Sequence, residues 1–330
     1  MKLPPEFISL SQEIGAQPLL VQGPGGNTSV KIEGHMWIKA SGTELAEARD
    51  KNIFVAVDPA KAMQELEGAG DGSCRSALIN PDGGLRPSIE TTFHAMFNHK
   101  FVFHFHSVAA ICHAIAEEGR TALAEKLSGL QWVSTPYRKP GIPLTKAIRE
   151  SVGSRDIQVI VLNNHGIIIL GNTVDEVREQ INEVEQRLNL PVLAEGTTNV
   201  PTADYPGWNN VSEVSALATI PHLFQRATSG TYYPDHIVFL GPAMPALSSS
   251  ELARLNPVEF PVPAVLVEGE GVYLKSDAKP AQRAMLDCIY HVLTRIPPDW
   301  ALLPIGHDAE AELLNWDAEK YRQTLAKRKG

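Results

Sequence analysis

The chain has 330 residues, of which 43% are hydrophobic, so it can bury one large core or two moderate ones. Its net charge of -9 argues against nucleic acid or an anionic membrane as its main partner. Three cysteines without a CxxC pattern argue against a disulfide framework. The first residues lack the apolar run of a signal peptide, and no segment approaches the length that spans a bilayer. These features predict a cytoplasmic globular protein.

The first part of the chain reads as a helix followed by strands. Apolar residues spaced along one face predict a helix at 5–17. A glycine-rich loop, GPGGN at 23–27, precedes short apolar runs that predict a hairpin over 30–39. A strand is predicted at 52–59, and the Gly-, Asp- and Ser-rich segment 67–87 reads as an exposed loop. The glycines do not match GxGxxG, which argues against a Rossmann nucleotide-binding domain.

The stretch RPSIETTFHAMFNHKFVFHFHSV carries four of the eleven histidines. We expect a helix that is capped by Ser88 and carries Glu90, followed by a strand. Alternation along that strand would place phenylalanines on one face, with His104 and His106 on the other. Two imidazoles side by side on one strand face, backed by phenylalanines, favour a metal site over solvent.

A second informative stretch is DIQVIVLNNHGIIILG, residues 156–171. Two apolar strands flank NNHG, which predicts a hairpin whose tight turn contains His165. Helices are predicted before and after this hairpin in the sequence. Ser107 caps one of them, a short helix covers 144–153, and a capping box opens a long amphipathic helix at Thr173.

The composition changes at about residue 195, which divides the chain into 1–195 and 196–330. The second part reads as an α+β unit that would pack on the first. It is expected to contain a helix, a strand, a hairpin with the turn EGEG and two final helices, the first two elements at 212–228 and 232–241 (YYPDHIVFLG).

A metal site can be assembled from these elements. Strand positions i and i+2 place His104 and His106 near enough to bind one ion, and His165 can supply a third imidazole. Three histidines and an open position are typical of a catalytic rather than a structural zinc site. Glu90 would act as a fourth ligand or carry a proton. His94, on the same side of the predicted helix as Glu90, is a supporting residue or an alternative ligand. The competing interpretation is a set of partly buried, hydrogen-bonded histidines.

Two loops of small residues are candidates for holding an anion on exposed backbone N–H groups. One is GPGGN and the other is Ala40-Ser41-Gly42. The alternative for each loop is a plain turn.

Four motifs resemble, in order and spacing, those of the class II aldolase and adducin family: GGNTSVKIEG, WIKASGTEL, RPSIETTFHAMFNHKFVFHFHSVA and VLNNHGIIILGNTVDE. The resemblance covers roughly residues 5–190. In addition, YYPDHIVFLGP resembles the aldolase portion of long rhamnulose-phosphate aldolase/dehydrogenase-like proteins. The resemblance implies an α/β fold with α/β/α layers, in which helices flank a central, mostly antiparallel sheet. The catalytic domain would be 1–195, with 196–330 as a C-terminal α+β extension packed on it.

The resemblance also implies a site and an assembly. A divalent metal, commonly zinc with Mn²⁺ or Co²⁺ as alternatives, would bind His104, His106 and His165. Glu90 matches the catalytic acid/base, and Tyr137 would correspond to a tyrosine that a neighbouring subunit of a cyclic homotetramer contributes. Members that act on ketose phosphates hold the phosphate at positions that match Gly26, Asn27, Ser41, Gly42 and Ser88.

One departure bears on the substrate. Ile89 stands where phosphate-binding relatives carry a second serine, so whether the small sugar substrate is phosphorylated stays open. We expect a metal-dependent aldehyde-lyase that cleaves or forms a C–C bond of a ketose or ketose 1-phosphate through a metal-stabilised enediolate. The first alternative is a pentulose-phosphate 4-epimerase of the same fold. An alternative of another class is a non-catalytic adducin-like interaction module, against which the three histidines and Glu90 argue.

Overall fold

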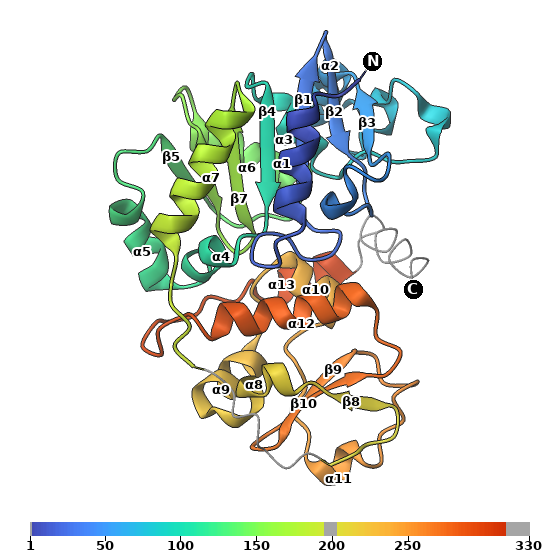
Figure 1. Ribbon diagram of the computed structural model, residues 1–330, viewed down its shortest axis with the longest axis vertical. Helices are drawn as coiled ribbons and strands as arrows, with labels where there is room; N and C mark the ends of the chain where they lie inside the picture. The colour runs from blue at the N-terminus through green and yellow to red at the C-terminus, as the bar shows by residue number, and fades with distance from the viewer. Residues whose placement is uncertain (1, 195–202, 315–330) are drawn as a thin grey trace.

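The computed structural model describes residues 2–194 and 203–314 of the chain (Figure 1). Its larger part is built on a seven-stranded sheet with the strand order β3-β2-β1-β4-β7-β6-β5. Neighbouring strands are antiparallel at every step except β5 with β6, which are parallel. The predicted mostly antiparallel sheet is therefore confirmed. Its strands are β1 (Asn27–Ile32), β2 (His35–Lys39), β3 (Phe54–Val57), β4 (Phe101–Phe105), β5 (Trp132–Thr135), β6 (Val159–Leu162) and β7 (Gly166–Gly171).

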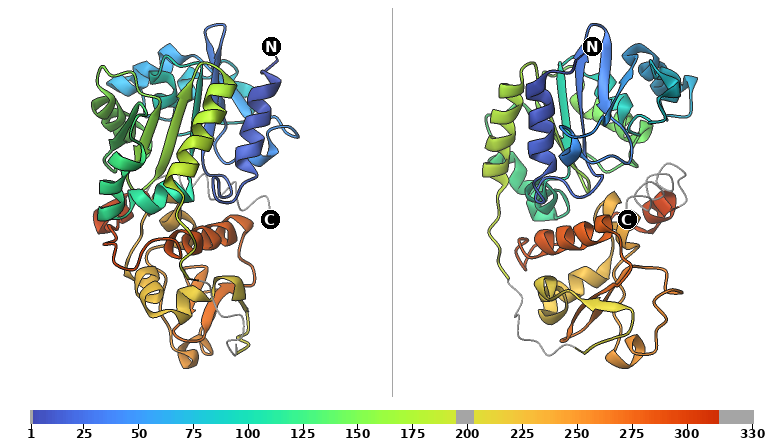
Figure 2. Two further views of the ribbon diagram at one scale, coloured as in Figure 1. Left: turned by 60° about the vertical axis from the view of Figure 1, so that its left-hand side comes forward. Right: turned by 45° about the vertical axis from the view of Figure 1, so that its right-hand side comes forward.

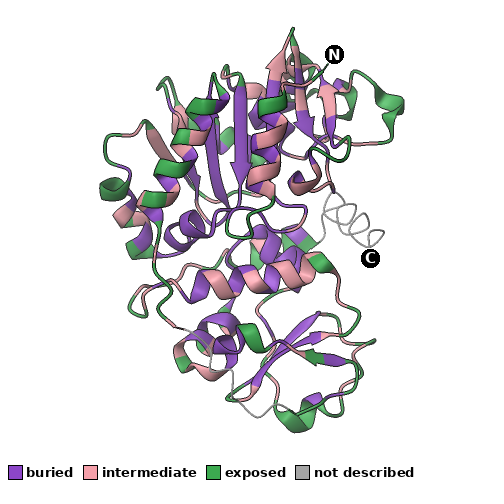
Figure 3. Ribbon diagram, in the orientation of Figure 1, coloured by how far each residue is buried: buried purple, intermediate pink, exposed green. Residues whose placement is uncertain are grey.

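Helices cover both faces of this sheet and give the three predicted layers (Figure 2). One face carries α1 (Pro5–Gly15), α4 (Val108–Ala114), α5 (Glu117–Lys126) and α7 (Val174–Leu188). The other face carries α2 (Pro59–Gln64), α3 (Thr91–Met96) and α6 (Ile142–Val152). The capping box predicted at Thr173 is present, and buried residues recur along α7 every three or four positions between more exposed ones (Figure 3).

Strand β4 lies in the middle of the sheet and shows the expected alternation. Phe101, Phe103 and Phe105 pack under α1 and α7, whereas Val102 joins the cluster on the opposite face. His104 is on that opposite face too. Its two neighbours across the sheet are Asn27 of β1 and Ile168 of β7.

The helix predicted to carry Glu90 begins two residues later than expected. Helix α3 starts at Thr91, and Glu90 occupies the preceding N-cap position with φ −102° and ψ 10°. Ser88 lies upstream, where its Oγ accepts the backbone N–H of Glu90 at 3.2 Å. Glu90 and His94 therefore do not share a helical face. The segment predicted as an exposed loop contains the short helical turns η3 (Arg75–Ala77) and η4 (Pro81–Gly83) and the end of η2 (Glu65–Ala69). Most of it is exposed, but Cys74 and Ala77 are buried in a core cluster.

The described residues from 203 onward form a second, smaller α+β unit, which we call the C-terminal lobe. Its sheet has the order β8-β10-β9, and the β9–β10 hairpin confirms the prediction around EGEG. The boundary predicted near 195 falls at residues outside the described ones, so the division at that point stays a prediction. The elements of the lobe are β8 (Trp208–Asn210), η5 (Ser212–Val214), α8 (Ala216–Thr219), α9 (Pro221–Ser229), α10 (Pro234–Leu240), α11 (Ser249–Leu252), β9 (Ala264–Val267), β10 (Gly271–Lys275), α12 (Pro280–Leu293) and α13 (His307–Leu314).

Two predictions in this lobe are wrong. YYPDHIVFLG contains the buried helix α10 instead of a strand. An apolar run of this length suits either element when it is buried on all sides. Pro234 opens the helix with a preset φ, and Gly241 ends it at φ +85°. The single helix expected at 212–228 is interrupted, because Pro221 starts a new helix after the extended Ile220.

The C-terminal lobe shares one apolar core with the larger part. Helix α4 contributes Val108, Ile111 and Cys112 to an apolar cluster, and Ile115 directly after the helix joins them. The cluster also includes residues of η5, α8, α9, α10, α12, α13 and the β9–β10 hairpin. The two parts meet at α12, which lies across the lower end of the large sheet in Figure 1. All three cysteines are buried, and no disulfide joins them. Within the described ranges, no helix combines the length and the apolar character needed to cross a bilayer.

Truncation of a side chain in this shared core should destabilise the protein strongly. Ile111→Ala removes a fully buried side chain and leaves a cavity, so we expect the free energy of unfolding to fall by about 2–5 kcal/mol. Val258 is 86% exposed, and Val258→Ala should change it by at most about 0.5 kcal/mol. Urea denaturation measures both values. Equal effects of the two substitutions would show that α4 does not anchor the lobe.

Candidate metal and substrate site

Three histidines converge at one end of the large sheet, where β4 ends and β6 turns into β7. His104 is in β4, His106 follows that strand directly, and His165 lies in the β6–β7 turn, where Asn164 adopts φ +54°. One ring nitrogen of each lies within 4.8 Å of the others, and all three residues are buried. Their ring centroids are 4.9–5.1 Å apart. The fold therefore assembles the three imidazoles that the sequence singled out.

Oxygen atoms orient two of these rings. Nδ1 of His104 lies 3.0 Å from the carbonyl oxygen of Ile167, which can only accept, so Nδ1 carries the proton and Nε2 keeps its lone pair. Nδ1 of His106 lies 3.1 Å from Oδ2 of Asp235 in α10, which leaves Nε2 of His106 in the same state. Burial lowers the pKa of His104, although the nearby carboxylate of Glu90 opposes this effect. His104 is thus held in the neutral form that binds metals.

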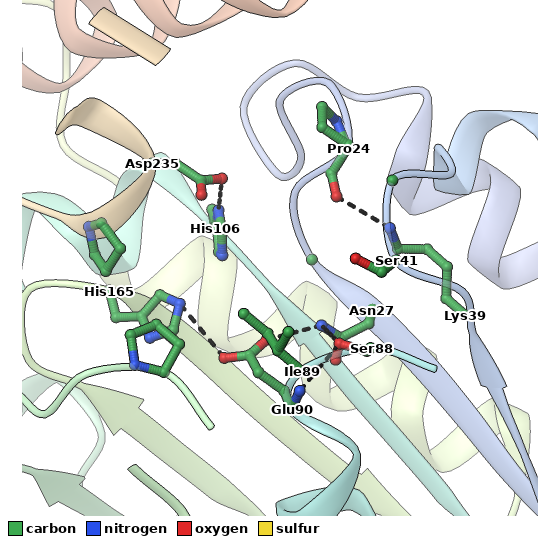
Figure 4. Close-up of a pocket in the computed structure, with 14 residues that line it drawn as sticks. Pro24, Asn27, Lys39, Ser41, Ser88, Ile89, Glu90, His106, His165 and Asp235 are labelled. Atoms are coloured by element: carbon green, nitrogen blue, oxygen red, sulfur yellow. Dashed lines mark hydrogen bonds and ion pairs between the residues drawn. The ribbon is translucent and has the colours of Figure 1, made fainter. Parts of the chain in front are cut away.

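The carboxylate of Glu90 faces the histidine cluster. Its Oε2 is 3.4 Å from Nε2 of His104. Its Oε1 is 3.7 Å from Nε2 of His165, a contact drawn in Figure 4. Asn27 holds Oε2 by donating a hydrogen bond of 2.8 Å from Nδ2. Oε1 is buried and accepts no hydrogen bond from the described residues. One carboxylate oxygen is therefore anchored, and the other is available to a reacting group.

A chain of hydrogen bonds explains His94, which lies outside the cluster. Burial holds the pKa of His94 well below its usual value, so the ring is neutral, with one donor and one acceptor nitrogen. Nε2 donates to Oδ1 of Asn27, and Nδ1, 2.8 Å from Oγ of Ser29, accepts the hydroxyl proton. Both ring nitrogens are used, so His94 orients Asn27, which in turn holds Glu90. Of the two roles considered for His94, supporting residue and alternative metal ligand, these contacts favour the supporting one.

The three histidines fit a divalent metal. Nε2 of His104 is buried, carries a lone pair and has no hydrogen-bond donor among the described residues. Burying such a group without a partner costs free energy, and a metal ion would supply the missing contact. The oxygens of Ile167 and Asp235 are the outer partners that metal-binding imidazoles characteristically have. His104, His106 and His165 could therefore hold the ion, with Glu90 beside it.

The predicted anion loops line one cavity together with His106, His165 and Glu90 (Figure 4). Nδ2 of Asn27 donates a hydrogen bond of 3.2 Å to Oγ of Ser88. The backbone N–H of Ser41 donates one of 2.9 Å to the carbonyl oxygen of Arg86. Ile89 lines the same cavity. The structure thus gathers all five positions considered for a substrate anion, namely Gly26, Asn27, Ser41, Gly42 and Ser88.

The sequence reading missed two charged residues in the wall of this cavity, Lys39 and Asp235. Both are 2% exposed. The ammonium of Lys39 donates to the carbonyl oxygens of Pro24 at 3.0 Å and Thr43 at 2.7 Å. A usable signal existed for Asp235, because it is a lone acid in an apolar run, the same feature that drew attention to Glu90.

Tyr137 does not line the cavity of its own chain. It lies on the loop that follows β5. Its hydroxyl oxygen is buried without a hydrogen-bond partner among the described residues, and burial raises the pKa of the phenol. Its role across a subunit boundary stays a prediction.

Comparisons with known proteins match the first part of the chain. Residues 6–191 match the family model described as the class II aldolase and adducin N-terminal domain. An uncharacterized oxidoreductase, YuxG of Bacillus subtilis, is 30% identical over 202 residues, which are 56% of this chain and 29% of that protein. The chain thus spans less than a third of that relative's length.

A solved structure matches the same region. It is the N-terminal class II aldolase domain of a conserved protein from Thermoplasma acidophilum, 27% identical with a TM-score of 0.50. The match covers 57% of this chain and 94% of that domain.

The close approach of β1 to β4 can be tested at Gly26. A Cβ on Gly26 would lie 2.8 Å from the carbonyl oxygen of His104, at φ +61°. Gly34 has a similar φ of +80°, but a Cβ there would meet nothing within 4 Å. Gly34→Ala should cost only the left-handed strain of about 1–2 kcal/mol. Gly26→Ala should cost clearly more, because it also pushes Asn27 away from Glu90. Chemical denaturation measures the difference, and equal losses would contradict this account.

Proposed function

Since the chain belongs to the class II aldolase and adducin family, we propose that it is a metal-dependent aldolase that cleaves or forms a C–C bond of a ketose. The observation that carries the proposal is the convergence of three buried imidazoles and one buried carboxylate, of which His106, His165 and Glu90 line a single cavity. Zinc is the proposed metal, because it favours three histidine nitrogens and an open position. When bound, it supplies a Lewis acid for the carbonyl and hydroxyl oxygens of the sugar.

Glu90 is the proposed acid/base. Asn27 holds its Oε2 at 2.8 Å, so Oε1 is the atom that we assign to the proton. In cleavage, Oε1 would deliver this proton to the substrate carbon that loses its bond, and in synthesis it would remove the proton from the same carbon. The hydroxyl of Tyr137, from a neighbouring subunit, is proposed to exchange a proton with the oxygen of the aldehyde fragment. The chain from Ser29 through His94 and Asn27 keeps the carboxylate in place.

An anionic substrate is favoured by Lys39. Its buried ammonium lines the cavity alongside Ser41, Gly42 and Ser88, and Ile89 removes only one hydroxyl from that wall. A fixed positive charge in a low-dielectric cavity attracts a phosphate more strongly than a hydroxyl does. We therefore propose that the substrate is a ketose phosphate.

A larger cavity of about 390 Å³ adjoins this one and shares Ser41, Ile89 and Pro140 with it. Its volume lies in the range of small-molecule sites. It offers room for the part of the sugar that does not react.

The metal and the acid/base have separable tests. We expect purified wild-type protein to contain about one divalent ion per chain and His104→Ala to lose it, because the ligand set is then incomplete. Glu90→Gln should retain the ion yet lose about 10²–10⁴-fold in turnover, because the proton carrier is gone. Metal analysis and an assay for released aldehyde measure the two effects.

The matched control is His99→Gln, since His99 belongs to the same stretch but lies near Asp156 at 3.9 Å, outside the cluster. It should keep both metal and activity. Folded wild-type protein without stoichiometric metal would refute the proposal. Epimer formation without aldehyde release would instead favour a 4-epimerase that uses the same residues.

The charge at Lys39 should govern the preference for phosphorylated substrates. A charge-assisted hydrogen bond is worth about 1.5–3 kcal/mol, so Lys39→Met should raise KM for a ketose phosphate by about 10–100-fold and change KM for the free ketose little. Lys31→Met is the control. Its ammonium also donates to two backbone carbonyls, those of His94 at 2.9 Å and His99 at 3.0 Å, but it does not line the cavity.

Kinetics with paired phosphorylated and free ketoses decide the point. An equal rise of KM for both substrates in Lys39→Met would contradict recognition of an anion by Lys39. An effect of general destabilisation would raise KM in Lys31→Met as well, so the change in KM specific to Lys39 is the difference between the two variants.

A further inference from the structure

We propose that Asp235, which belongs to the C-terminal lobe, is a positioning residue for the metal ligand His106. The inference rests on the metal centre proposed above and adds to it a residue outside the region that matches the family model, which ends at residue 191. The lobe is then part of the catalytic apparatus and not an appendage to it.

The contact between the two side chains is buried on both sides. Oδ2 of Asp235 lies 3.1 Å from Nδ1 of His106, and the two side chains are 2% and 6% exposed. A carboxylate that is removed from water needs a charged or hydrogen-bonding partner. The N–H at Nδ1 of the imidazole is such a donor. Asp235 is therefore placed to fix both the tautomer and the rotation of the ring.

This arrangement has a direct consequence for the metal. With the proton held on Nδ1 by the carboxylate, the lone pair of His106 resides on Nε2. A carboxylate behind a metal-binding imidazole also increases the electron density on the ligand nitrogen, and loss of such a partner typically weakens metal binding about 10–100-fold. Among the three ligands, His106 is the one with a carboxylate at Nδ1. His104 has only the carbonyl oxygen of Ile167 there.

The pair is confined from two directions. Helix α10, which carries Asp235, is buried along its whole length, and the Tyr233 hydroxyl just before it donates to Sγ of Cys288 in α12 at 3.3 Å. On the other side, the backbone of Gly25 passes so close that a Cβ there would lie 3.0 Å from Nδ1 of His106 and 3.1 Å from Oδ2 of Asp235. The glycine loop and α10 together leave the carboxylate little freedom.

The lobe also holds the turn that carries His165. Nδ2 of Asn164 donates to the carbonyl oxygens of Tyr232 at 3.0 Å and Leu303 at 2.6 Å. Asn164 is the residue of that turn with positive φ, +54°. These bonds are independent of Asp235, yet they act on the same cluster. Two of the three ligands, His106 and His165, are thus positioned through contacts with the C-terminal lobe.

The experiment measures metal affinity and not only activity. Metal-free full-length protein is titrated with Zn²⁺ against a chromogenic chelator, and the visible absorption of the Co²⁺-loaded protein reports the geometry of the ligands. We expect Asp235→Asn, which keeps an acceptor but loses the charge, to weaken Zn²⁺ binding about tenfold. Asp235→Ala should weaken it about 10–100-fold and alter the Co²⁺ spectrum. Asn164→Gly, which tolerates the positive φ, should also weaken binding.

The control is Tyr233→Phe. It removes the hydrogen bond to Cys288 next to the same helix but leaves the contact with His106 intact, so its Zn²⁺ affinity and Co²⁺ spectrum should match wild type. If Asp235→Asn does not fold, Gly25→Ala replaces it, because the added methyl group separates the same pair without deleting a polar atom. Weaker binding in that variant supports the proposal.

Wild-type affinity in folded Asp235→Asn and Asp235→Ala, or in the replacement Gly25→Ala, would overturn this inference and leave the proposed function intact. An equal loss of affinity in Tyr233→Phe would also overturn it, because the effect would then be general destabilisation of the lobe. Absence of metal binding by the wild-type protein would instead overturn the proposed function and this inference together.

Discussion

The cost of burying ionisable groups is the constraint on which the rest of the structure depends. Glu90 and the three histidines are all at most 5% exposed, and each needs compensating partners in place of water. These partners come from elements that are far apart in the sequence. Asn27 comes from β1, the carbonyl of Ile167 from β7, and Asp235 from α10. The elements around the site are held together because each supplies a polar partner for a group that another element buries away from water.

The large sheet supplies the precision of this arrangement. Register places Asn27 directly opposite His104, and the absence of a side chain at Gly26 lets the two strands approach. The phenylalanines on the other face of β4 fix the strand against α1 and α7, so the histidine side cannot rotate or slip. A slip of one residue would turn His104 into the core on the opposite face. The apolar core and the polar site are therefore two faces of the same strand.

The C-terminal lobe acts at the end of that strand. It shares an apolar cluster with α4, which begins only two residues after His106, and its helix α10 reaches the histidine itself. Burial of that apolar surface fixes the position of the lobe relative to the large sheet. The hydrogen bond between Asp235 and His106 requires such a fixed position. Packing and chemistry are coupled here, because the same helix supplies core side chains and a carboxylate to the site.

Local patterns determined much of the fold and part of the site. Alternation along β4, the turn NNHG and the capping box at Thr173 each depend on neighbours within a few residues, so the sequence predicted them correctly. Likewise, the spacing of His104 and His106 follows from the period of a strand. The motifs quoted above also carried the family resemblance, since they record which residues of the larger part occur together.

Only the tertiary structure decided what depends on distant contacts. The apolar run of α10 suits a helix or a strand equally until its surroundings are known. When the run is interpreted as a strand, nothing in it indicates that Asp235 contacts His106. The partners of His94 lie 65 and 67 positions earlier in the chain, so nothing near it in sequence could show that both its nitrogens are used. Lys39 ends a strand like any surface lysine, and its burial and its hydrogen bonds to the carbonyls of Pro24 and Thr43 appear only in the folded chain. The sequence by itself determined which side chains could do chemistry, and packing across the sheet and the lobe decided which atoms face one another.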